Sequence, residues 1–298
     1  MQLNRTMSGV CSGSLHDFRW EIVENVSGLL SSPVGVIDDQ VFCTSVSQFD
    51  GIARATVLGS TLGLIELESS SHFVAVAPSK WGAGIAGFGR SSFIFSVEGE
   101  RINLGVPAGV TSVDIDCVNS FGVVGGSVEV RGEQCGAIWR DGVCEVVPSL
   151  RAITAMSDAS ELFGILPSGA PVRLRDIAEF SGSGRIVAAN MEGDALVSSQ
   201  NEISIWRSTG GVEAVAIRGY ERISAIDWSN RGVILGFGVN ARGQIEHWLF
   251  DSKVGLKVLT NQVLDSDLRL QVVSAIGRDG TMVGIALSES DRHVVRLY

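Results

Sequence analysis

Short apolar segments of four to seven residues alternate with polar turns along nearly the whole chain. Examples are Ser92–Ser96, Val143–Val147 and Val212–Ala216, which are rich in Val, Phe and Ile or alternate apolar with polar residues. Alternation with a period of two is typical of β-strands, and no stretch keeps a helical stripe of period 3.6 for more than two turns. The pattern therefore predicts an all-β protein.

One motif recurs along this pattern. Its clearest copy is Ala275–Gly284, and further copies begin near residues 35, 77, 116, 155, 188 and 225, at intervals of about 33 to 50 residues. A second element precedes the motif: an apolar strand that ends in a polar turn, as in the nearly identical Ala137–Gly142 and Ile205–Gly210. Each repeat thus reads as four antiparallel strands, the content of one propeller blade.

A single four-stranded sheet cannot bury its two faces, whereas repeats stacked in a ring bury one another. We therefore predict a seven-bladed β-propeller of four-stranded antiparallel sheets, as one domain over residues 1–298. Phe18–Val23 is expected to be the fourth strand of the last blade, beside His293–Tyr298, so that the two ends of the chain close the ring. A pair of β-sandwiches, an open solenoid, and blade counts of six or eight remain alternatives.

Composition narrows the function only slightly. The chain has 298 residues, 36 of them glycine, which suits many tight turns, and its net charge of −10 disfavours a nucleic-acid partner. No apolar run is long enough for a membrane span, and the start lacks the apolar core of a signal peptide. We expect a cytoplasmic monomer that does not associate with membranes.

The sequence predicts no metal site and no cofactor. The five cysteines form no Cys-x-x-Cys pair, and the four histidines fall in different repeats, so a ring would spread them apart. No phosphate-binding loop of the Walker type occurs.

Carboxylates offer the one route to catalysis. Asp114 and Asp116 share a strand face by the two-residue period, at the start of a repeat where an inner strand would face the central channel. Two carboxylates could catalyse the hydrolysis of a glycosidic bond. The other interpretation of these aspartates is structural, because aspartate often initiates a turn such as those that leave the inner strands. A carbohydrate-active hydrolase or lyase that uses channel-facing carboxylates is therefore the alternative function.

Irregularities within the repeat indicate where a partner could bind, because insertions often lie on a binding face. The longest insertion, residues 260–271, carries Asp265, Asp267 and Arg269, while Trp228 and Trp81 lie at turns. These residues show no convergent catalytic set. They favour a non-enzymatic binding module for a protein, peptide or glycan partner, and they leave open whether the protein is an enzyme.

The paired elements also resemble a known repeat. The matching segments are His16–Trp20, Ala137–Trp139, Ile205–Trp206, His247–Trp248 and His293–Val295, followed by Gly122–Gly125 and Gly280–Gly284. Together they resemble the HAF-type β-propeller repeat of bacterial proteins, although no copy spells His-Ala-Phe. The resemblance covers nearly the full chain and implies a propeller fold, but it implies no particular activity.

Overall fold

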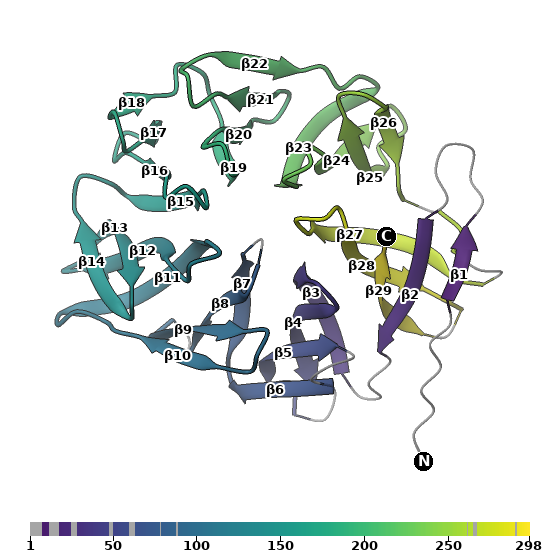
Figure 1. Cartoon of the computed structure of the whole chain (residues 1–298), viewed down its shortest axis with the longest axis horizontal. Helices are drawn as coiled ribbons and strands as arrows, with labels where there is room; N and C mark the ends of the chain where they lie inside the picture. Colours follow the sequence, from purple (N-terminus) through teal and green to yellow (C-terminus); the bar gives the residue numbers. More distant parts are fainter. Residues whose placement is uncertain are drawn as a thin grey trace.

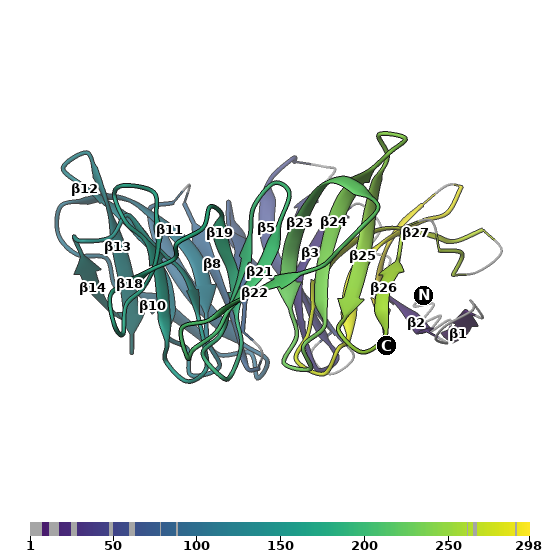
Figure 2. The ribbon, with the colours of Figure 1, turned by 90° about the horizontal axis from the view of Figure 1, so that it is seen from above.

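The computed structural model describes residues 8–11, 18–24, 29–47, 50–59, 63–77, 79–87, 89–260, 262–264, 267–289 and 291–298. Seven antiparallel sheets stand around a common axis (Figure 1), and in the side view their strands run roughly parallel to that axis (Figure 2). The predicted seven-bladed propeller is therefore confirmed, and the β-sandwich and solenoid alternatives are wrong. None of the described residues forms a helix that could cross a membrane.

Each blade runs from an inner strand at the axis to an outer strand at the rim. The first four blades are β3 (Leu29–Ile37), β4 (Gln40–Ser47), β5 (Ala53–Gly59) and β6 (Gly63–Ser69); β7 (His72–Val76), β8 (Trp81–Ala86), β9 (Ser91–Ser96) and β10 (Arg101–Leu104); β11 (Val110–Val118), β12 (Val124–Val130), β13 (Glu133–Arg140) and β14 (Val143–Val147); β15 (Ala152–Met156), β16 (Leu162–Ile165), β17 (Pro171–Arg173) and β18 (Ala178–Glu179).

The remaining three blades follow the same order. They are β19 (Arg185–Ala189), β20 (Ala195–Ser198), β21 (Ile203–Trp206) and β22 (Val212–Val215); β23 (Tyr220–Trp228), β24 (Ile234–Asn240), β25 (Ile245–Asp251) and β26 (Gly255–Val258); and β27 (Arg269–Ile276), β28 (Met282–Leu287), β29 (Arg292–Leu297) and β2 (Phe18–Glu24), with β1 (Ser8–Cys11) at the edge.

The two ends of the chain close the ring, as predicted. Strand β2 pairs antiparallel with β29, with Trp20 opposite Leu297, and so becomes the fourth strand of the last blade (Figure 1). Trp20 is 2% exposed, and Arg296 forms an ion pair with Glu21 across this junction. Strand β1 adds a fifth strand outside β2, which the sequence did not predict.

The core lies between the blades. One buried cluster joins Trp81 and Ile94 of the second blade to Ile115 and Trp139 of the third, and the other clusters repeat this arrangement around the ring. Small residues allow the close approach that this packing needs: a Cβ atom at Gly82 would lie 2.5 Å from the ring of Phe42 in the preceding blade. Each sheet is therefore stabilised by its neighbours, which explains why the repeat closes on itself.

Candidate functional site

All seven inner strands carry a β-bulge near their C-terminal ends. The register of the inner strand against the second strand shifts by one residue at Val34, Val74, Asp116, Thr154, Val187, Ile226 and Ser274. The residue before each bulge is buried, and the bulged residue itself is more accessible. A bulge bends its strand and redirects one side chain. One bulged residue from each blade therefore lies near the C-terminal end of its inner strand, and we call these seven residues the bulge ring.

The bulge ring surrounds a cavity of about 460 Å³. Residues from all seven inner strands line it, including every bulge-ring residue except Thr154. The lining also includes Asn230, Gly277 and Arg278, which belong to the turns that follow inner strands β23 and β27. The cavity thus lies at the C-terminal ends of the inner strands.

The wall of this cavity combines aliphatic side chains with a larger surface of polar atoms. Val34, Val74, Val187 and Ile226 supply four of the seven bulge-ring side chains, and Thr154 and Ser274 are neutral. Asp116 is the one ionisable residue of the bulge ring. Its carboxylate makes no hydrogen bond or ion pair within the described part of the chain. Burial, and then the neighbouring charge of Asp114, raise the pKa of Asp116 from 3.8 to about 6.

The cavity has a second carboxylate, Asp227, with a different role. It occupies the position that carries Gly or Ala in five other blades and Cys117 in the third. Its Oδ1 accepts a hydrogen bond from the N–H of Trp228 at 2.7 Å, and its Oδ2 accepts one from the N–H of Ile276 at 3.1 Å. Burial raises the pKa of Asp227, while these two bonds act in the opposite direction. Asp227 is therefore a link between the sixth and seventh blades.

In the third to seventh blades, five-residue turns connect the inner to the second strands. In the third blade Asn119 opens the turn and Gly122, at φ +77°, donates its N–H to the carbonyl of Asn119 at 3.0 Å. The same geometry recurs at Ser157, Asn190, Ser229 and Gly277. Two of these turns expose apolar side chains, Phe121 at 72% and Met191 at 46%.

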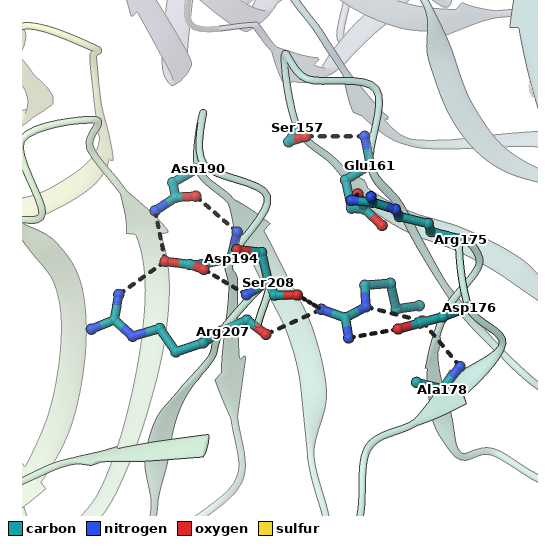
Figure 3. Close-up of polar contacts among 10 residues, drawn as sticks. Ser157, Glu161, Arg175, Asp176, Ala178, Asn190, Asp194, Arg207 and Ser208 are labelled. Atoms are coloured by element: carbon teal, nitrogen blue, oxygen red, sulfur yellow. Dashed lines mark hydrogen bonds and ion pairs between the residues drawn. The ribbon is translucent and has the colours of Figure 1, made fainter. Parts of the chain in front are cut away.

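A polar network joins the turns of the fourth and fifth blades (Figure 3). Arg173 pairs with Asp176 and donates to the carbonyls of Arg207 and Ser208, while Asp194 accepts from Arg207 and from the N–H of Ser208. Arg173 is buried and also lies over the ring of Trp206, 5.0 Å from its centroid. Because its charges are paired, the network fixes the two blades against each other and leaves little capacity for a ligand.

The structure places the predicted carboxylates on the same strand. Asp114 and Asp116 are both accessible on β11, with buried Ile115 between them, as the two-residue period predicted. Only Asp116 lines the cavity. The charge of Asp114 also acts on His72 of the neighbouring inner strand, although burial lowers the pKa of that histidine overall.

The two predicted tryptophans do not occupy equivalent positions. Trp228 ends inner strand β23 and lines the cavity, whereas Trp81 begins second strand β8 after its turn. Both are buried, at 8% and 7% exposure, so neither presents an open indole face. Lys80 lies 4.8 Å from the centroid of the Trp81 ring.

The predicted insertion lies away from the cavity. It leads into the N-terminal end of β27, whereas the cavity is at the C-terminal ends of the inner strands. Asp267 and Arg269 are exposed there, and Asp265 is outside the described residues. The structure therefore does not bring Asp267 and Arg269 together with Asp114, Asp116 or Trp228.

Sequence reasoning missed most of the bulge ring and Arg278. A signal for the ring was present: from the second to the seventh blade, the bulged residue stands three positions before the first residue of the turn, as with Asp116 before Asn119 and Ser274 before Gly277. Among the described residues no group of three or more histidine, cysteine or acidic side chains could hold a metal ion.

No family model matches the chain. Part of it is 34% identical over 95 residues to the maltose/maltodextrin transport system permease protein MalF of Yersinia pestis, which corresponds to 31% of this chain and 17% of that protein. The chain thus spans less than a fifth of the length of this relative, and the match assigns no family.

Solved structures share the fold at low identity. A catalytically inactive virginiamycin B lyase from Staphylococcus aureus with quinupristin has a TM-score of 0.59 and 13% identity, covering 94% of this chain and 99% of that one. The selenomethionine-substituted form of this lyase has a TM-score of 0.54 and 12% identity, and the match covers 94% of this chain and 98% of that one. A prolyl endopeptidase has a TM-score of 0.50 and 12% identity, and the match covers 95% of this chain and 55% of the endopeptidase chain. These likenesses support the propeller fold alone.

Proposed function

We propose that this protein is a non-enzymatic binding module that holds a ligand in its central cavity. The observation that carries the proposal is the bulge ring: seven blades repeat one backbone irregularity, and six of the seven bulged residues line the same cavity. A concave site that combines apolar side chains with polar groups at fixed positions can hold a small ligand. The cavity suits a small molecule or the end of a protein, peptide or glycan chain.

The alternative, a carbohydrate-active hydrolase or lyase, has weaker support. Glycoside hydrolysis commonly uses two carboxylates that flank the substrate. Of the two carboxylates that line the cavity, Asp227 is engaged by two backbone N–H groups, and only Asp116 is open. Asp114 lies on the same strand as Asp116 but does not line the cavity. The cavity therefore favours binding over this chemistry.

A fragment screen tests the proposed function. Wild-type protein and the cavity-filling variant Ser274→Phe would be screened by ligand-observed NMR against the same library of several hundred small fragments. Ser274 lies on the cavity wall, so a phenyl ring there occupies the space between the blades. We expect fragments that bind the wild type to lose at least about tenfold in affinity for the variant, because the site is filled.

Ala241→Phe is the matched control, since Ala241 is exposed in the turn between β24 and β25. This variant should bind the same fragments as the wild type. Equal fragment binding by Ser274→Phe, or no binding by the wild type, would contradict the cavity as the binding site.

The finer assignment of the repeats stays a prediction. The tryptophans of the proposed HAF-type motif at positions 139, 206 and 248 all lie on third strands, whereas Trp20 lies on the outer strand β2. Trp139 donates its indole N–H to the carbonyl of Gly105 and is fully buried. The motif thus has a structural role between blades, and it supports the propeller fold without pointing to an activity.

A further inference from the structure

We propose that the cavity binds a small organic amine, with its ammonium group against Asp116 and its apolar part against the aliphatic side chains of the bulge ring. This inference rests on the proposed function and names the ligand class of the same site. It follows from how charge is distributed along the cavity wall.

Three charged residues line the cavity: Asp116, Asp227 and Arg278. Arg278 is exposed in the turn after β27, and its Nη2 contacts the Met191 sulfur at 3.4 Å, so it lies at the rim. Asp227 has both oxygens occupied by backbone donors. The open charge at the level of the bulge ring is therefore a single negative one.

The residues around Asp116 leave that charge uncompensated. Val74 of β7 and Thr154 of β15 occupy the bulge position in the two neighbouring blades. The Thr154 hydroxyl is buried and has no hydrogen-bond partner in the described part of the chain. The nearby ionisable groups are Asp114 and the Cys117 thiol on β11 and His72 on β7, and none of them supplies a positive charge that pairs with Asp116. A protonated amine would supply the missing counter-charge.

The aliphatic side chains of the bulge ring indicate which chemical group could accompany the ammonium group in the ligand. Val34, Val187 and Ile226 come from the first, fifth and sixth blades and line the same cavity. They can pack against a hydrocarbon group but cannot hydrogen-bond to sugar hydroxyls. A small hydrocarbon group that carries an ammonium group can therefore contact these side chains and the carboxylate at the same time.

Isothermal titration calorimetry with a matched pair of probes tests the inference. Benzylamine, protonated at pH 7.5, and its neutral counterpart benzyl alcohol have nearly the same shape. We expect benzylamine to bind the wild type at least about tenfold more tightly, since only the amine can pair with the carboxylate. Asp116→Asn should remove that preference, while Glu221→Gln should keep it, because it makes the same charge change at an exposed residue near the other end of an inner strand.

The pH dependence gives a second readout. As the pH falls below about 6, Asp116 takes up a proton, and the preference for the amine should disappear in the wild type. Equal affinity for amine and alcohol, an unchanged preference in Asp116→Asn, or no saturable amine binding would overturn the inference. If fragments without an amine still bind the wild type and lose affinity for the Ser274→Phe variant, the proposed function stands and only the ligand class is wrong.

Discussion

Asp116 carries a cost to stability that its position explains. Its pKa is about 6 in the folded protein and 3.8 when unperturbed, so the folded state holds the proton more tightly. Stability therefore falls as the pH rises from about 4 to 6, and the full penalty is present above pH 6. Residues that destabilise a fold while facing a cavity are typical of functional sites.

Replacing this carboxylate should stabilise the protein. At pH 7.5 we expect Asp116→Asn to raise the free energy of unfolding by about 1 kcal/mol, a value reduced for the accessibility of the side chain to solvent. The gain should vanish near pH 4, where the wild-type carboxyl is also neutral in the folded state. Urea titrations at the two pH values measure both quantities. A variant that is less stable than wild type at pH 7.5 would contradict the assignment.

At the residue scale, the sequence predicted which two aspartates share a strand face but not which of them lines the cavity. The two-residue period correctly placed Asp114 and Asp116 on one face of a strand. The bulge that places Asp116 on the cavity wall is one extra residue between Ile115 and Cys117, and in the sequence it is marked only by its spacing of three residues before the turn. The bonds of Asp227 to a neighbouring blade depend on long-range packing, which a single sequence does not reveal.

At the scale of elements, the inner hairpin turn is the unit that repeats. Counted from the first residue of the turn, its fourth residue has a positive φ from the second to the seventh blade, and it is Gly122, Gly193, Gly232 and Gly280 in four of these six blades. In the second blade it is Lys80, at φ +72°, and in the fourth it is Ser160, at φ +63°. A residue with a Cβ is strained in this conformation, so the serine costs stability that glycine does not.

Exchanging these residues tests the turn. We expect Ser160→Gly to stabilise the protein by about 1 kcal/mol and Gly232→Ser to destabilise it by a similar amount. A Cβ at Gly232 meets nothing within 4 Å, so the second change adds backbone strain without a clash. Thermal unfolding of the two variants measures both effects. If both variants shift the melting temperature in the same direction, a positive φ at this position is not what the turn requires.

The strands themselves were predicted well because their signals are local. The predicted repeat starts near residues 35, 116, 155, 188, 225 and 275 fall within inner strands, whereas the start at Ala77 comes one residue after the end of β7. The first inner strand is longer than predicted, beginning at Leu29 rather than near Val34, because its N-terminal half pairs with the polar end of β4. Element boundaries follow pairing partners, and these are not visible in the segment itself.

At the scale of the whole molecule, closure depends on strand β2. It pairs with β29, and the N–H of Tyr298 donates to the carbonyl of Arg19 at 2.8 Å. The sequence predicted this pairing because the last repeat lacks a fourth strand and Phe18–Val23 is otherwise unassigned. It could not predict β1, which lies outside the four-stranded repeat.

Truncation should reveal how far the ring depends on this strand. Deleting residues 1–24 removes β2 and exposes the edge of β29, so we expect the melting temperature of the whole protein to fall by roughly 10 °C or more. Deleting residues 1–11 removes only β1 and should have little effect. Calorimetry that shows an unchanged transition after the longer deletion would refute closure by β2.

The central claim is that the bulge ring forms one binding site shared among the blades, and methyl NMR tests it most directly. With labelled Val and Ile methyl groups, saturation with benzylamine should shift Val34, Val74, Val187 and Ile226 together, since all four line the cavity. The exposed Val143 and Val212 of outer strands should not shift. Shifts confined to the outer strands, or to Val263 in the connection that precedes β27, would contradict the claim.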